Sequence, residues 1–97
     1  MIPKHFSLYD EGTYLEFFSE SSSHRHFLLF SDKGCRFVLD EIEGVEIALH
    51  ILEGEARDET HDKDICEGDT FVIPCGDESR FRTLTEHLIC DLTFKKE

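Results

Sequence analysis

Apolar residues recur at every second position through much of this chain. The clearest cases are residues 45–51 (VEIALHI) and 88–94 (LICDLTF), in which alternate residues form a continuous apolar face. Successive side chains of a β-strand point to opposite faces, so this period of two predicts half-buried strands. No stretch of helical spacing is longer than about two turns. The chain is therefore expected to be all-β.

Turn signals separate many short strand candidates, as in a β-sandwich or barrel. The expected strands are 13–18, 24–30, 35–42, 45–52, 70–73, 79–85 and 87–94. The last two are expected to form a hairpin around Thr85-Glu86, with the side chains of Arg80 and Arg82 pointing outward. The polar segment 55–64 (EARDETHDKD) is expected to be a hairpin connection.

Residues 51–79 combine two glycine turns with a strand that ends at a proline. Gly54 and Gly68 permit tight turns, and Asp69 can accept hydrogen bonds from backbone amides of the second turn. Pro74 cannot donate a ladder hydrogen bond and therefore suits a strand end. The spacing of Gly68, Pro74, Gly76 and Ser79 is the most specific pattern in the chain.

This pattern, with ILEGEA at 51–56 and GDTFVIP at 68–74, resembles the second motif of the cupin superfamily and the turn that precedes it. The resemblance implies a cupin-type double-stranded β-helix, that is, a jelly-roll barrel. It covers about residues 35–94, and we expect one domain over 1–97. The second half, including RTLTEHLICDLTF at 82–94, is also similar to the N-terminal sensing domains of AraC-type regulators.

The resemblance also implies where a metal site would lie. The family's ligand glutamate falls at Ile47 and a ligand histidine at Ser79. The other two histidines fall at Glu41 and Glu43, or at Asp40 and Ile42 in the alternative register. Since none of these positions holds a histidine, we expect no metal and no other cofactor.

The altered positions are candidates for a ligand pocket: Glu41, Glu43, Ile47, Ser79 and Phe81. Glu41 and Glu43 are an alternative carboxylate pair for acid–base chemistry.

His24 and His26 form the only H-x-H in the chain. On a strand the two rings share a face, so an unusual metal site with one acidic residue is an alternative to solvated histidines. The other histidines are expected to be solvated: His50 on an outward face, and His61 and His87 in loops.

The chain has 22 acidic and 10 basic residues among 97, a formal net charge of −12. This charge argues against direct contact with nucleic acid. The sequence has no secretory signal and no apolar run long enough for a membrane helix, so a cytoplasmic protein without membrane contact is expected. The four cysteines (Cys35, Cys66, Cys75 and Cys90) are expected to be buried or partly buried thiols.

Three functions remain open. The leading hypothesis is a metal-free, non-enzymatic barrel that binds a small molecule or acts as a regulatory, homodimeric module. AraC-type sensing domains precede a DNA-binding region, so either that region was removed or this barrel stands alone. The alternative is a small cupin enzyme (isomerase, epimerase or dioxygenase-like) with an atypical site. The third is a barrel whose only role is assembly, since open strand edges favour pairing of copies.

Overall fold

The computed structural model describes residues 6–8, 10–40, 46–73 and 77–95, with the backbone alone at 6–8. These residues form strands and turns without any helix, so no membrane-spanning helix occurs among them. The all-β prediction is confirmed. The strands are β1 (Phe6–Leu8), β2 (Thr13–Glu20), β3 (His24–Asp32), β4 (Arg36–Asp40), β5 (Ile47–Glu53), β6 (Glu55–Asp58), β7 (Lys63–Cys66), β8 (Thr70–Val72), β9 (Glu78–Thr83) and β10 (His87–Lys95).

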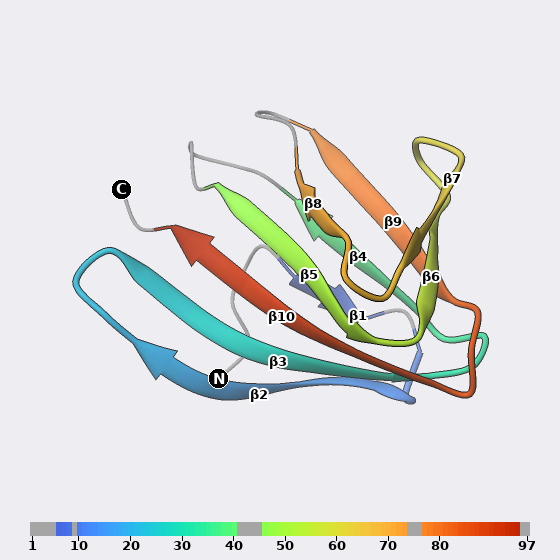
Figure 1. Ribbon diagram of the computed structural model, residues 1–97, viewed down its shortest axis with the longest axis horizontal. Helices are drawn as coiled ribbons and strands as arrows, with labels where there is room; N and C mark the ends of the chain where they lie inside the picture. Colours follow the sequence, from blue (N-terminus) through green and yellow to red (C-terminus); the bar gives the residue numbers. More distant parts are fainter. Residues whose placement is uncertain (1–5, 9, 41–45, 74–76, 96–97) are drawn as a thin grey trace.

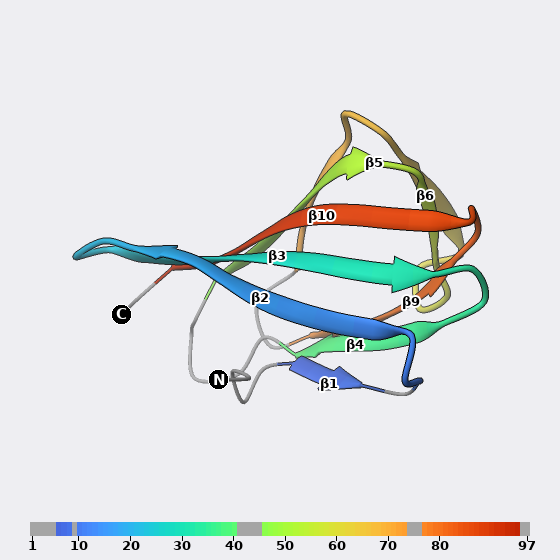
Figure 2. The same cartoon turned by 90° about the horizontal axis from the view of Figure 1, so that it is seen from below.

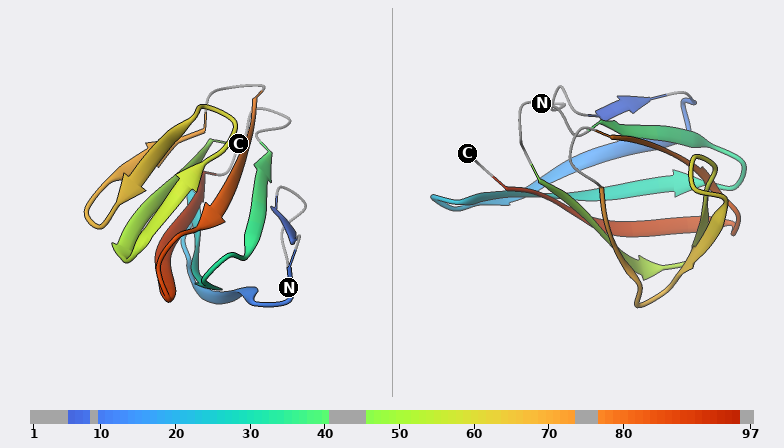
Figure 3. Two further views of the ribbon diagram at one scale, coloured as in Figure 1. Left: turned by 90° about the vertical axis from the view of Figure 1, so that its right-hand side faces the viewer. Right: turned by 90° about the horizontal axis from the view of Figure 1, so that it is seen from above.

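The strands pair in antiparallel fashion to form two five-stranded sheets that face each other (Figure 1). Sheet A has the order β1-β4-β9-β6-β7, and sheet B has the order β2-β3-β10-β5-β8. Figure 2 shows β1 and β4 of sheet A on the side opposite β5 of sheet B. The two further views in Figure 3 show the same two layers. This arrangement is the predicted jelly-roll barrel.

The core lies between the inner faces of the two sheets. Seven alternate residues of β5 and β10 are at most 3% exposed: Ile47, Leu49, Ile51, Leu88, Cys90, Leu92 and Phe94. Burying a large aliphatic or aromatic side chain contributes about 1.5–3 kcal/mol. The two apolar faces predicted from the period of two are therefore confirmed as the inner face of sheet B.

β9 and β10 follow each other in the chain but do not pair. β9 lies between β4 and β6 in sheet A, whereas β10 lies between β3 and β5 in sheet B. The predicted hairpin around Thr85-Glu86 is wrong, because residues 84–86 cross from one sheet to the other. Hydrogen bonds hold this crossing against β6: the Leu84 N–H donates to the Glu55 carbonyl (2.9 Å), and the Glu55 N–H donates to Oγ1 of Thr85 (3.0 Å).

The polar segment 55–64 is more than a connection. It contains all of β6 and the first two residues of β7, which pair in register as a hairpin around residues 59–62. The segment was predicted to be a hairpin connection, but it itself supplies β6 and part of β7 of a hairpin. Charged residues occupy both strands because only alternate side chains, such as Ala56 and Ile65, face the core.

The two glycine turns form as predicted. Gly54 and Gly68 have φ angles of 91° and 92°, which favour glycine. The carboxylate of Asp69 accepts a 2.8 Å hydrogen bond from the Cys66 N–H, and the Asp69 N–H donates to the Cys66 carbonyl at 2.9 Å. Asp69 therefore caps the turn that joins β7 in sheet A to β8 in sheet B.

Three buried hydroxyl groups connect the sheets at one end of the barrel. Oγ1 of Thr83 on β9 donates to Oγ of Ser31 on β3, and Oγ of Ser31 is hydrogen-bonded to Oγ1 of Thr13 on β2, both at 2.7 Å. All three residues are at most 3% exposed. Each hydroxyl therefore has a partner inside the core, as buried polar groups require.

The described cysteines are free thiols in three environments: Cys90 is buried, Cys35 is half-buried and Cys66 is exposed. The expectation of buried or partly buried thiols is therefore wrong for Cys66, whose side chain points away from the core on edge strand β7. Cys75 lies outside the described residues.

Candidate functional site

The structure places three of the five predicted pocket residues inside the barrel. Ile47, Ser79 and Phe81 are each 0% exposed. Glu41 and Glu43 lie outside the described residues. Ile42, which is one of the two positions in the alternative register, and Gly44 also lie outside them. Arg80 and Arg82, on either side of Phe81 in β9, point outward as expected, and they form ion pairs with Glu78 and Glu59, respectively.

Phe81 is part of an aromatic stack in the core. Its ring stacks on Phe37 with centroids 5.2 Å apart and meets Phe71 edge-on at 5.8 Å. Ile47 belongs to the same buried cluster of apolar residues. Packed apolar side chains therefore fill the interior around Ile47, the position where the resemblance places a ligand glutamate.

Ser79 differs from Ile47 and Phe81 because it carries a hydroxyl group inside the barrel. Among the described residues, its Oγ has no hydrogen-bond partner. An unpaired buried hydroxyl is unfavourable by about 1–3 kcal/mol. The hydroxyl of Ser79 is thus a polar group inside the barrel, at the position where the resemblance places a ligand histidine.

His24 and His26 lie on the outer face of sheet B, with ring centroids 6.1 Å apart. Nδ1 of His24 is hydrogen-bonded to Oγ of Ser23 at 2.8 Å, and Nδ1 of His26 lies 3.6 Å from the carboxylate of Asp91. Within the described ranges, no group of three or more His, Cys, Asp or Glu side chains is arranged to hold a metal ion. The two rings share a face, but among the described residues no third ligand completes a metal site with them.

A second polar cluster, missed in the sequence, surrounds His61 in the turn between β6 and β7. Nδ1 of His61 lies 2.8 Å from Oδ2 of Asp58, and Nε2 lies 3.0 Å from Oδ2 of Asp77. Asp58 is 0% exposed and its Oδ1 also accepts the N–H groups of Thr60 (3.0 Å) and His61 (3.1 Å). We call Asp58, His61 and Asp77 the histidine clamp.

The clamp joins the β6–β7 turn to the start of β9. Hydrogen bonding to Asp58, then to Asp77, raises the pKa of His61 above its ordinary value. The backbone N–H of Glu78, then His61, lowers the pKa of Asp77. The protonated imidazole donates one N–H to each carboxylate. With both nitrogens engaged, the clamp positions the turn and has no free nitrogen for proton transfer to a substrate.

Arg57 supports the same turn from its outer side. Its guanidinium donates to Asp64 across the hairpin at 2.7 Å and also forms a short ion pair with Asp62. These contacts raise the pKa of Arg57, with the hydrogen bond to Asp64 as the largest cause. The turn is therefore held on both sides by charged hydrogen bonds.

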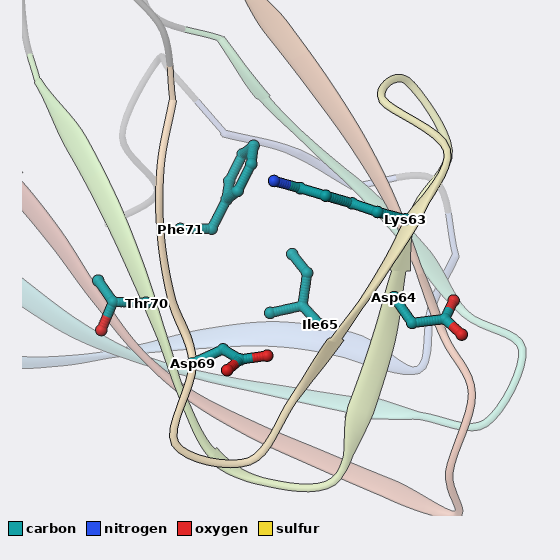
Figure 4. Close-up of a pocket in the computed structure, with 6 residues that line it drawn as sticks. All are labelled: Lys63, Asp64, Ile65, Asp69, Thr70 and Phe71. Atoms are coloured by element: carbon teal, nitrogen blue, oxygen red, sulfur yellow. The ribbon is translucent and has the colours of Figure 1, made fainter.

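A side opening lies beside the clamp, between β7 at the edge of sheet A and β8 at the edge of sheet B. It has a volume of about 160 Å³ and is lined by Lys63, Asp64, Ile65, Asp69, Thr70 and Phe71. Figure 4 shows Lys63 and Phe71 pointing toward each other across the gap, while Asp64 points away from it. The Lys63 ammonium lies 4.5 Å from the centre of the Phe71 ring, and the His61 ring lies 5.8 Å from it.

Phe71 is therefore shared between the opening, which it lines, and the core, against which it packs. The Phe71 ring contacts the ring of Phe81 in an edge-to-face arrangement. Lys63 and His61 also lie close to the Phe71 ring. A cation over an aromatic face is attracted by the ring quadrupole. The arrangement offers an aromatic surface and a positive charge to a molecule that enters between the sheets.

The Asp58–His61 pair was visible in the sequence as an aspartate three residues before a histidine. Its second partner, Asp77, is 16 positions from His61 and is brought close only by the pairing of β6 with β9. The expectation of a solvated His61 is therefore wrong: its side chain is 31% exposed and bound on both sides.

Comparison with solved structures identifies the architecture. KdgF from Halomonas sp. superposes with a TM-score of 0.76 over 95% of this chain and 88% of its own, at 14% identity. The cupin domain of Schizosaccharomyces pombe Cnp3 has a TM-score of 0.73 and 14% identity, over 88% of this chain. The chain has the cupin fold. No protein-family model and no curated protein matches the sequence.

An HTH_3 family transcriptional regulator from Vibrio cholerae is also similar, with a TM-score of 0.73 and 12% identity over 89% of this chain. This chain spans 61% of the Cnp3 chain and 52% of the regulator chain. Structural similarity at identities this low shows the fold alone, which is the fold predicted from residues 51–79. Function has to be argued from the residues of this chain.

Proposed function

We propose that this cupin is a metal-free, small-molecule-binding module with a regulatory role, and that its ligand binds at the side opening between β7 and β8. The observation that carries the proposal is the position of Lys63 and Phe71. They face each other across the opening, and the Phe71 ring that lines it also packs against Phe81 of the aromatic stack in the core. Concave sites that pair an apolar surface with a few polar groups are typical of ligand sites.

The chemistry of the interior favours binding over catalysis. Apolar Ile47 stands where the family has a ligand glutamate, and the hydroxyl of Ser79 is a poor substitute for an imidazole as a ligand of a transition metal. The clamp histidine uses both ring nitrogens within the protein. The similarity of fold to a transcriptional regulator is compatible with a sensing role.

Two measurements test this proposal. Metal analysis of protein purified without a histidine tag is expected to find no stoichiometric transition metal. A thermal-shift screen with small acids and sugars is expected to find a compound that raises the melting temperature. A stoichiometric bound metal contradicts the metal-free reading, and the absence of any stabilising compound contradicts the binding role.

The site is tested with Lys63→Met and Phe71→Ala. Both are expected to weaken the binding of a compound found in the screen, because they remove the cation and the ring that face each other. Lys33→Met is the matched control, since Lys33 is an exposed lysine in the turn between β3 and β4. Equal affinity in the control and in Lys63→Met contradicts the placement at the side opening.

We also propose that the cupin forms a homodimer. β2 is an edge strand of eight residues, and its Phe17 and Phe18 are 48% and 66% exposed. Unpaired strand edges and exposed aromatic side chains both favour pairing with a second copy. Light scattering at micromolar concentration is expected to give the mass of a dimer, and Phe18→Asp is expected to reduce it. A monomeric wild-type protein contradicts this part of the proposal.

A further inference from the structure

The outer face of sheet B carries a second cavity, which shares no lining residue with the side opening. Four residues occupy one row across four strands: Tyr14 pairs with Phe30, Phe30 with Ile89, and Ile89 with Glu53. Leu29 and Cys90, the chain neighbours of Phe30 and Ile89, are buried inside the barrel. Since successive side chains of a strand point to opposite faces, Phe30 and Ile89 face outward. The cavity above the row has a volume of about 340 Å³ and is also lined by Asp32 and His87.

An aromatic wall forms one side of this cavity. The rings of Tyr14 and Phe30 are stacked with centroids 5.1 Å apart and planes at 18°. Tyr14 is 55% exposed, so its ring remains accessible to a molecule in the cavity. The negative face of such a ring attracts an organic cation.

Carboxylates stand on opposite sides of the cavity. Asp32 on β3 has a side chain that is 68% exposed and lies 3.6 Å from Nδ1 of His87. Glu53 is exposed at the end of β5. β10 separates β3 from β5, so the two acidic strands are two strand spacings apart, roughly 10 Å. The cavity between them has an apolar floor that includes Ile89.

These features together select a ligand of one charge type. An aromatic wall, an apolar floor and two separated carboxylates suit a flexible molecule with a positive group at each end. The net charge of −12 raises the local concentration of cations and opposes anions. A volume of about 340 Å³ is within the range of small-molecule sites.

We propose that the cavity at Tyr14, Phe30 and Glu53 binds organic cations of the aliphatic diamine class. One ammonium group is placed near Glu53 and the other near Asp32, with the methylene chain along Phe30 and Ile89. This site is independent of the side opening, and the two proposals stand or fall separately.

The test uses 1,4-diaminobutane, butylamine and 1,4-butanediol as probes, with binding followed by amide chemical shifts at about 0.15 M salt. At this ionic strength long-range attraction is screened, so uptake by net charge alone is reduced. We expect saturable binding of the diamine with shifts centred on Phe30 and Ile89. Butylamine is expected to bind about two- to fivefold more weakly, as the loss of one exposed ion pair implies. The diol is expected not to bind.

Matched variants separate a site from general electrostatic attraction. Glu53→Gln and Tyr14→Leu are each expected to weaken diamine binding about two- to fivefold, the scale of one exposed charge or cation–π contact. Glu67→Gln removes the same charge from an exposed turn, and Phe18→Leu removes an exposed ring from the same strand, so both are expected to bind as the wild type does. All four positions are exposed, and circular dichroism confirms folding. Equal weakening by Glu67→Gln, binding of the diol, or absence of saturation overturns the proposal.

Discussion

Nε2 of His61 lies 3.0 Å from Oδ2 of Asp77, although the two residues are 16 positions apart. On its other side the same ring contacts the fully buried Asp58 at 2.8 Å. The clamp therefore links a turn of the β6–β7 hairpin to the first residues of β9. Since both partners are carboxylates, the strength of this link depends on the protonation of His61.

We predict that the clamp stabilises the fold at mildly acidic pH and less so at alkaline pH. The raised pKa of His61 means that its contribution is complete below the ordinary histidine pKa of about 6.5 and is lost as pH rises through the folded-state value. The lowered pKa of Asp77 means that its contribution is lost as pH falls below about 4. Urea unfolding of wild type and His61→Gln at about pH 5.5 and about pH 9 should show the larger difference at pH 5.5.

His87→Gln is the control for this comparison, because the His87 side chain is 73% exposed and Nδ1 lies 3.6 Å from Oδ1 of Asp32. Its effect on the free energy of unfolding is expected to be small at both pH values. If His61→Gln destabilises the protein equally at both, the charged form of His61 is not what holds the turn.

We predict opposite effects for two buried Ser→Ala changes in the barrel. Ser31→Ala leaves the hydroxyls of Thr13 and Thr83 without their common partner, and we expect destabilisation of about 1–3 kcal/mol. Ser79→Ala removes a hydroxyl that has no partner among the described residues, so stability is expected to be unchanged or to rise by up to about 1 kcal/mol. Denaturant unfolding of the two variants gives both values, and a marked loss for Ser79→Ala would reveal a hidden polar contact.

We predict that Cys66 and Cys90 react with a maleimide at very different rates. Burial raises the pKa of Cys90 to about 12, so its thiolate is scarce and inaccessible in the folded protein. Cys66 is exposed, although desolvation and nearby Glu55 raise its pKa as well. Peptide mapping after labelling at about pH 8 should find Cys66 modified before Cys90, and both modified in urea. Early modification of Cys90 would indicate that the barrel opens readily.

The sequence predicted the strands of this barrel better than it predicted their partners. The alternation at Leu88, Cys90, Leu92 and Phe94 identified the buried face of β10, because burial follows from the period of two alone. The sequence did not show that residues 84–86 cross between sheets. A short polar turn is compatible with either connection, and the choice depends on contacts such as that of Leu84 with Glu55.

The same limit explains the site predictions. Gly54 and Gly68 were recognised because a positive φ leaves a local signature in the sequence. The opposition of Lys63 and Phe71 depends on how two strands diverge after the turn at Gly68, and no local pattern encodes that distance.

The two turn glycines differ in their surroundings, and this difference gives a last prediction. A Cβ at Gly68 would meet no atom within 4 Å, so Gly68→Ala is expected to cost only the strain of a positive φ, about 1–2 kcal/mol. A Cβ at Gly54 would collide with the His87 carbonyl and with Oγ1 of Thr85. That threonine hydroxyl bonds both Glu55 and His87, so it cannot move without breaking the contacts that hold the crossing between sheets.

Gly54→Ala is therefore expected to destabilise the protein by about 1–3 kcal/mol more than Gly68→Ala, the usual range for overpacking. Thermal or urea unfolding of both variants measures the difference directly. Because the φ angles of the two glycines are nearly equal, backbone strain cancels in the comparison. Equal destabilisation would show that β10 can shift away from Gly54 at no cost, and that the crossing at residues 84–86 is not fixed by the Thr85 hydroxyl.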